Sequence, residues 1–183
     1  MSIGASLNAR FFLGLHPNSK ETINTMKVEW QILTNPDPRL RITAEPIDVP
    51  EVKTPEYQEF ADKFAAFMIE EDGIGLAATQ IGLNKRIIAV LEGERISVYA
   101  NPEIIKASAA TIENEEGCLS VPGVYGIVDR AKKIRFRAIN RHGRKVEFDA
   151  SGFQGTIYQH EIDHLNGVLF IDKAKSTRGK QKK

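Results

Sequence analysis

The sequence is poor in cysteine and in long apolar runs, and each shortage narrows what the chain can be. Its 183 residues include one cysteine, Cys118, so no internal disulfide framework can form. A lone thiol suits a reducing compartment, and we therefore expect a cytoplasmic protein. No apolar run approaches the roughly 18–20 residues that cross a bilayer, so we expect no membrane partner.

An excess of charge of either sign is also missing. Lysine and arginine together number 25, aspartate and glutamate 24, and the formal net charge is +1. The chain as a whole therefore has no polyanion-binding character, and no specific DNA partner is expected. The length suits one domain with a sizeable core, and the hydrophobic content of 42% is ordinary for a globular protein.

The two ends of the chain differ in composition from the middle. Residues 1–25 contain no acid before Glu21, and we interpret them as a leader that is either disordered or an organelle-targeting segment. Translation that begins at Met26 is a third interpretation. Residues 173–183 contain six lysines and arginines and predict a basic, flexible tail. The compact domain is expected at residues 26–172.

Helical and extended patterns follow one another along this domain. Thr54-Pro55-Glu56 combines an N-cap hydroxyl, a first-turn proline and an acid, and apolar residues then recur at helical spacing until Gly73. Glycine accepts the left-handed conformation common just past a helix, so Gly73 would end this helix. "RIIAVLE" and "RISVYANP" predict strands, and "KKIRFRAINRHGRKVEF" predicts a hairpin turning at residues 141–144.

A second apolar stretch, after Gly152, predicts a buried C-terminal helix that contains "YQHEIDHLNG". His160 and His164 are four residues apart, so both rings lie on one helix face and can reach one metal ion. Glu161 is placed to act as general base for metal-bound water, as in the H-E-x-x-H pattern. The alternative is a helix whose histidines make only structural hydrogen bonds.

A catalytic site of this kind takes a third protein ligand and leaves a fourth position open. In some H-E-x-x-H proteases the third ligand is a histidine at the position of Phe170, which cannot bind a metal. In others it is a carboxylate on another helix downstream, but only Asp172 follows here and the chain is nearly over. Cys118, within "EEGCLSVPG", is the best remaining donor, and we expect it to complete a Cys-His-His site. The alternative is that Cys118 is simply a small buried residue.

The stretch "GIGLAATQ", residues 73–80, superficially matches a dinucleotide-binding fingerprint. It follows a predicted helix rather than a strand, so we set that function aside. We interpret Gly73 and Gly75 as positions where a ligand approaches the backbone, and Gln80 as an amide donor to that ligand. A tight helix-to-strand turn is the alternative.

Three motifs in this order, "GIGLAATQ", "EGCLS" and "QHEIDHLNG", resemble those of the peptide deformylases. The resemblance covers about residues 28–172. It implies a metal-dependent hydrolase that removes the N-formyl group from the N-terminal methionine of newly made polypeptides and releases formate, with residues 26–172 as the catalytic domain. The expected partners are nascent N-formylated polypeptides and, transiently, the ribosome, which the basic tail could contact through phosphates.

The resemblance also implies roles for individual residues. The Cys-His-His group would hold one divalent metal ion per chain, with iron(II) expected first and zinc, nickel or cobalt as alternatives. Glu161 would act as general acid and base while metal-bound water attacks the formyl carbon. The side-chain amide of Gln80 and the backbone N–H of Leu119 would stabilise the oxyanion.

For the substrate, the resemblance implies an extended peptide held between residues 73–75 and 116–119 by backbone hydrogen bonds. The expected substrate-binding residues are Ile74, Gly75, Gly117, Phe153 and Ile157, of which Ile74, Phe153 and Ile157 would line the methionine pocket.

Three positions depart from the pattern of many relatives. Asn114 and Thr156 are polar where aliphatic residues are common, and Tyr125 stands where some relatives have an arginine. A related amidohydrolase whose substrate has changed is therefore one alternative function. A non-catalytic module whose fold the metal stabilises is another. Asp163 needs a partner if it is buried, and we hypothesise an ion pair with Arg130 that fixes the helix.

Overall fold

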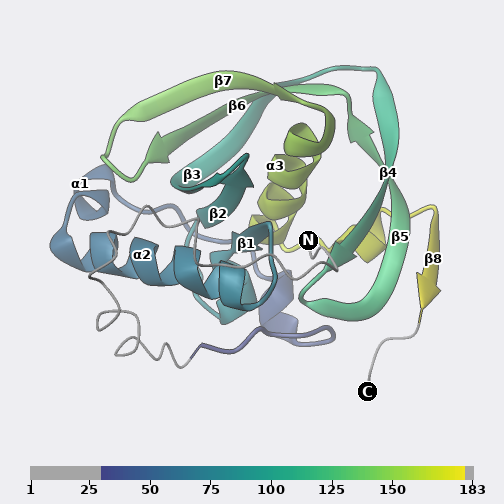
Figure 1. Ribbon diagram of the computed structural model, residues 1–183, viewed down its shortest axis with the longest axis horizontal. Coiled ribbons are helices and arrows are strands. Elements are labelled where there is room, and N and C mark those ends of the chain that lie inside the picture. The colour runs from purple at the N-terminus through teal and green to yellow at the C-terminus, as the bar shows by residue number, and fades with distance from the viewer. Residues whose placement is uncertain (1–29, 180–183) are drawn as a thin grey trace.

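The computed structural model describes residues 30–179, shown in Figure 1. The expected leader, residues 1–25, lies outside these residues. The helices are η3 (Pro38–Arg41), α1 (Val49–Val52), α2 (Pro55–Glu70), η4 (Ala78–Ile81), α3 (Gly152–Leu165) and η5 (Phe170–Asp172), where η marks a 3-10 helix. The strands are β1 (Gly75–Ala77), β2 (Ile87–Glu92), β3 (Arg95–Ala107), β4 (Thr111–Cys118), β5 (Val121–Ala131), β6 (Lys133–Asn140), β7 (Lys145–Ser151) and β8 (Ser176–Gly179).

The predicted first long helix is α2, and its N-terminus has the predicted cap. The Thr54 hydroxyl accepts a hydrogen bond from the backbone N–H of Tyr57 at 3.2 Å, and Pro55 occupies the first helical position. The prediction for its C-terminus is wrong in detail, because Asp72, with φ of 55°, adopts the left-handed conformation in place of Gly73. A short polar side chain tolerates this conformation better than most.

The strands form two antiparallel sheets. One has five strands in the order β1-β2-β3-β6-β7, and the other has three in the order β4-β5-β8. β6 and β7 pair from Lys133↔Ser151 to Ile139↔Lys145, which confirms the predicted hairpin. The predicted α+β fold is confirmed, with a single domain of mostly antiparallel strands around a C-terminal helix.

The helix α3 lies between the two sheets in Figure 1, and α2 lies on the other side of the five-stranded sheet. Alternate residues of β2 face the two helices. Ile88 and Val90 belong to the hydrophobic cluster that includes the apolar residues of α3, here called the α3 cluster. Ile87 and Ala89 belong to the cluster that includes the apolar residues of α2, here called the α2 cluster. Residues 155–165 of α3 are all buried, so its polar side chains need partners inside the protein. Within residues 30–179, no helix has the length and apolarity to span a membrane.

The C-terminal segment differs from the predicted flexible tail that was to begin after residue 172. Ser176–Gly179 forms β8 and pairs with β5, so the compact domain continues to at least Gly179. Its cations are held by acidic side chains of the neighbouring strands, a long-range pairing that local composition does not reveal. The ion pairs are Lys175 with Glu113 and Asp129, and Arg178 with Glu115.

Candidate metal centre and active site

Three side chains from distant parts of the sequence meet at one buried point. Cys118 ends β4, and its thiol lies beside His160 and His164, which belong to the C-terminal half of α3. Their donor atoms all lie within 4.8 Å of one another, and Sγ of Cys118 is 3.1 Å from Nε2 of His164. Ligands of one tetrahedral ion lie about 3.5 Å apart, so the arrangement fits a metal of this coordination.

Buried polar atoms without partners support the same interpretation. Nε2 of His160 and both carboxylate oxygens of Glu161 are buried and have no hydrogen-bond partner among the described residues. Leaving such groups unpaired is costly unless a ligand satisfies them. The orphaned His160 nitrogen and the soft thiolate donor are the groups that a divalent transition metal would use.

The electrostatics of the three donors also favour a cation. Burial would raise the pKa of the Cys118 thiol, but His164 and His160 outweigh it and lower that pKa well below its ordinary value. Burial would lower the pKa of His160, whereas Cys118 and Glu116 raise it to about 9. The site therefore stabilises a thiolate and a positive charge next to it, and a divalent ion would supply that charge in place of the proton.

Glu116 contacts one of the expected metal ligands, and the sequence analysis did not identify it. Its Oε2 accepts a hydrogen bond from Nδ1 of His160 at 2.7 Å, which leaves Nε2 as the nitrogen that could bind a metal. Burial would raise the pKa of Glu116, but hydrogen bonds from Arg130 and His160 lower it to about 2. The signal was present in "EGCLS", because residues two apart on a strand share a face, and Glu116 therefore points the same way as Cys118.

The predicted ion pair between Arg130 and Asp163 is present. Arg130 is 3% exposed, and its Nη1 donates to Asp163 while Nε and Nη2 donate to Glu116 at 2.7 and 2.9 Å. Lys173 contacts Asp163 from the outer side at 2.6 Å. The guanidinium of Arg130 thus links the carboxylate of Asp163 on α3 to the carboxylate of Glu116, which orients His160.

Gln80 and Leu119 flank the cysteine. The Gln80 Oε1 accepts a hydrogen bond from the backbone N–H of Ala77 at 2.8 Å, which fixes the amide orientation. Its Nε2 then points at Ser120 Oγ, 3.1 Å away, and at Cys118 Sγ, 3.7 Å away. Leu119 follows Cys118 directly and packs its side chain against the α2 cluster. Ser120 was not singled out from the sequence.

Gly75 faces the catalytic candidate rather than open space. A Cβ atom at this position would overlap the carboxylate of Glu161. The sequence analysis expected a ligand to approach this backbone, and the structure shows that the nearest group is the Glu161 side chain itself. Because β1 and α3 pack closely, a side chain at residue 75 would force the Glu161 carboxylate to move.

The expected substrate-binding residues differ in how far they are buried and in what they contact. Ile74 and Ile157 belong to the core cluster around α3, with 4% and 2% exposure, whereas Phe153 in the first turn of α3 is 60% exposed. Gly117 pairs with Tyr125, whose ring leaves no room for a side chain at residue 117.

The three residues that depart from the pattern of many relatives each make a different contact. Tyr125 is stacked under the guanidinium of Arg178 at 4.9 Å. Thr156 is buried, with its hydroxyl 3.3 Å from the Gly152 carbonyl, and Asn114 donates to the Ile112 carbonyl at 3.3 Å.

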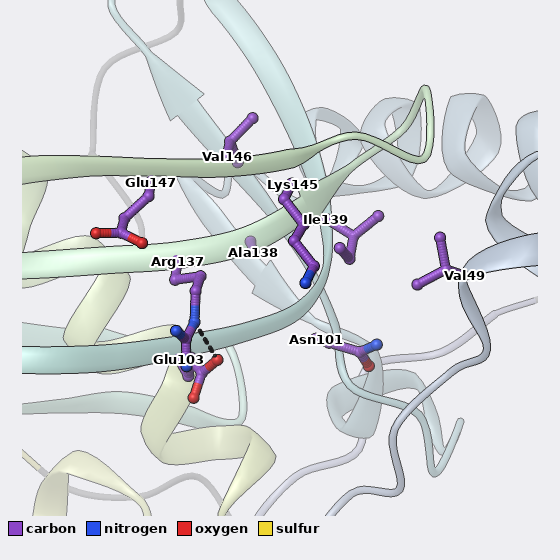
Figure 2. A pocket seen from close by; sticks show the side chains of 9 residues that line it. All are labelled: Val49, Asn101, Glu103, Arg137, Ala138, Ile139, Lys145, Val146 and Glu147. Carbon is purple, nitrogen blue, oxygen red and sulfur yellow. Dashed lines mark hydrogen bonds and ion pairs between the residues drawn. The ribbon is translucent and has the colours of Figure 1, made fainter.

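A separate groove of about 640 Å³ lies on the outer face of β3, β6 and β7 (Figure 2). Arg137 crosses it and donates to Glu103 at 2.7 Å, and Lys145 and Val49 stand at its end. None of the residues that line this groove is an expected site residue. The groove is therefore distinct from the Cys-His-His centre.

Comparisons with known proteins agree with the geometry. The sequence model of the family described as polypeptide deformylase matches residues 30–180. A peptide deformylase of Alkalilimnicola ehrlichii is 46% identical over 145 residues, which cover 77% of this chain and 79% of the relative. A peptide deformylase of Carboxydothermus hydrogenoformans is 46% identical over 138 residues, which cover 75% of this chain and 88% of the relative.

Solved structures give the same result. The crystal structure of the Thermotoga maritima peptide deformylase has a TM-score of 0.75 and 34% identity, and the match covers 80% of this chain and 98% of that one. A Met-Ala-Ser-bound class I type b peptide deformylase from Acinetobacter baumannii has a TM-score of 0.76 and 34% identity, covering 81% and 99%. With most of its length matched in sequence and in fold, this chain belongs to the polypeptide deformylase family of enzymes.

Proposed function

We propose that this enzyme removes the formyl group from the N-terminal methionine of newly made polypeptides and releases formate. The observation that carries the proposal is the buried Cys-His-His group, beside which the carboxylate of Glu161 has no hydrogen-bond partner among residues 30–179. The tripeptide bound to the Acinetobacter relative begins with methionine, which supports a methionyl substrate.

Cys118, His160 and His164 would hold one divalent ion, for which we propose iron(II), with zinc, nickel or cobalt as substitutes. When bound, the metal supplies Lewis acidity that activates water and polarises the formyl oxygen. The three residues present a thiolate and two imidazoles from a rigid strand end and a buried helix. Glu116 holds the His160 ring through Nδ1, so the direction of Nε2 is set before the metal enters.

Glu161 is proposed as general base and then general acid. Its oxygens are buried and free of protein partners among the described residues, so one of them can take a proton from the attacking water. The same oxygen then returns that proton to the leaving amine of the peptide. Gly75 keeps the carboxylate in place by leaving it just enough room.

Gln80 and Leu119 are proposed to stabilise the negative charge that develops on the formyl oxygen. The carboxamide of Gln80 is already oriented by the Ala77 N–H, and the formyl oxygen would replace Ser120 Oγ or Cys118 Sγ as an acceptor of its Nε2–H groups. The backbone N–H of Leu119, next to Cys118, would be the second donor. Preorganised donors of this kind act on the transition state rather than on substrate binding.

The peptide is proposed to lie extended beside β1 and the end of β4, where it would pair with the backbone of Gly75 and Gly117. Ile74, Phe153 and Ile157 would surround the methionine side chain. Phe153 is well exposed, and the methionine side chain would cover its ring. Main-chain pairing explains how one enzyme could accept many sequences after methionine.

Because translation supplies these substrates, we propose that the enzyme works in the cytoplasm and contacts ribosomes transiently. Lys173, Lys175 and Arg178 are engaged in ion pairs, so they offer less to RNA than the sequence suggested. The electrostatic contribution of the tail would then come from its last three lysines, at residues 180, 182 and 183.

The direct test is formate release from N-formyl-Met-Ala-Ser by protein purified without oxygen and loaded with iron(II) or nickel. Glu161→Gln should lower kcat by about 10²–10⁴ while metal content stays unchanged. The exposed Glu113→Gln serves as the matched control and should retain full activity. Absence of formate release by the loaded wild-type protein would refute the proposal, and faster cleavage of another amide would favour a drifted amidohydrolase.

A further inference from the structure

Lys173 stands at the outer end of a chain of charged side chains that reaches the metal centre. Its Nζ lies 2.6 and 2.7 Å from the two carboxylate oxygens of Asp163. Asp163 also accepts a hydrogen bond from Arg130, Arg130 clamps Glu116, and Glu116 holds Nδ1 of His160. Charged contacts therefore run without a break from a lysine that is 43% exposed to an expected metal ligand.

Arg130 divides its donors between two buried carboxylates. Two of its nitrogens serve Glu116 and one serves Asp163, and the side chains of these acids are 0% and 12% exposed. A buried carboxylate needs compensating charge and hydrogen bonds, so the two acids compete for one guanidinium. Lys173 contacts both oxygens of Asp163 and so relieves this competition.

We propose that Lys173 is a positioning residue for the metal centre. By satisfying Asp163, it leaves Arg130 to clamp Glu116, and the orientation of the His160 ring is kept through that clamp. This inference rests on the proposed metal site. Losing the direct partner of a metal-ligating histidine costs about 10–100-fold in metal affinity, and Lys173 acts three contacts further out, so we expect about threefold to tenfold faster metal release.

The competing explanation is that Lys173 only anchors the C-terminal segment. Lys175 and Arg178 anchor the same segment to acids on β4 and β5, and among residues 30–179 neither forms an ion pair with Asp163 or Glu116. If anchoring were the whole role, removing any of the three cations would have the same effect. These two residues are therefore matched controls.

The experiment compares wild type with Lys173→Gln, Lys173→Arg, Lys175→Gln and Arg178→Gln, each loaded with cobalt(II). Two properties are measured: the rate of metal release to excess chelator, and the visible spectrum of the bound cobalt, which reports ligand geometry. Lys173→Gln should release cobalt about threefold to tenfold faster and shift the spectrum, and Lys173→Arg should restore both. The two control variants should behave as wild type does.

Equal release rates for Lys173→Gln and Lys175→Gln, with identical spectra, would overturn the inference. Should Lys173→Gln fail to fold, Lys173→Met keeps the aliphatic stem and provides the same comparison. A wild-type protein that binds no cobalt through Cys118 would instead refute the proposed metal site, so the two failures are distinguishable.

Discussion

Replacing Arg130 by leucine removes the cation between two buried carboxylates. The side chain of Arg130 is 3% exposed, that of Glu116 is 0% exposed and that of Asp163 is 12% exposed, so water cannot replace the lost charge. Breaking a buried pair by removing one partner costs about 3–5 kcal/mol. Because Lys173 still compensates Asp163, we expect the lower end, about 3 kcal/mol.

This loss of unfolding free energy should lower the midpoint of thermal unfolding. A domain of this size changes its midpoint of thermal unfolding by about 2–4 °C per kcal/mol, so the Arg130→Leu protein should melt about 6–12 °C lower. Its metal affinity should also fall about 10–100-fold, because Glu116 would hold His160 less firmly without the guanidinium.

The assays are urea and thermal unfolding of the metal-free protein and metal content after dialysis. Arg135→Leu is the matched control, because Arg135 also pairs with two acids, Glu147 and Asp149, but is 41% exposed. Exposed pairs contribute about 0–1 kcal/mol, so this variant should unfold almost as wild type does. If Arg130→Leu unfolds with the same free energy as Arg135→Leu and keeps its metal, the argument from burial is wrong.

Three further predictions concern Gln80, Gly75 and Glu92. Gln80→Ala should lower kcat for formyl-peptide cleavage about 10²–10³-fold with little change in KM, whereas an effect confined to KM would contradict a transition-state role. Gly75→Ala should retain its metal but lose most activity, because the added Cβ displaces the Glu161 carboxylate; unchanged kcat would show that this position is not critical. Burial alone would raise the pKa of Glu92, but hydrogen bonds from Tyr158 and Tyr99 outweigh it and lower that pKa. The stabilisation by ionised Glu92 is therefore present above its unfolded-state pKa of about 4.5 and is lost as pH falls through the lower folded-state pKa. In urea titrations from about pH 6 to 3, wild type should lose more stability than Glu92→Gln, and parallel pH profiles would contradict this.

Local patterns predicted those features whose causes are local. The cap of α2 at Thr54 follows from a hydroxyl that satisfies a free backbone N–H, and the β6–β7 hairpin follows from alternating apolar residues and a glycine-containing turn. His160 and His164 share a helix face because of helical geometry alone. Cys118 was reached by elimination, and it was the only cysteine that could serve.

Features that depend on partners far along the chain were missed or misjudged. Glu116 lies 44 residues from the histidine that it orients, and the strand pattern near it indicates only that it shares a face with Cys118. The basic segment after residue 172 was predicted as a flexible tail, yet Arg178 pairs with Glu115, 63 residues away, and helps to hold β8. Composition reports charge, whereas order depends on which opposite charges come within reach.

The sequence by itself determined the chemistry available to this protein: one thiol, an H-E-x-x-H helix and a glutamine after a glycine-rich turn. Only the tertiary structure decided that these groups converge, that Gly75 leaves room for Glu161, and that a chain of buried charges ends on Lys173. The physical reason is that residue type and local spacing set which bonds a side chain can make. The packing of α3 between two sheets decides which partners are close enough to make them, and burial decides how much each contact contributes.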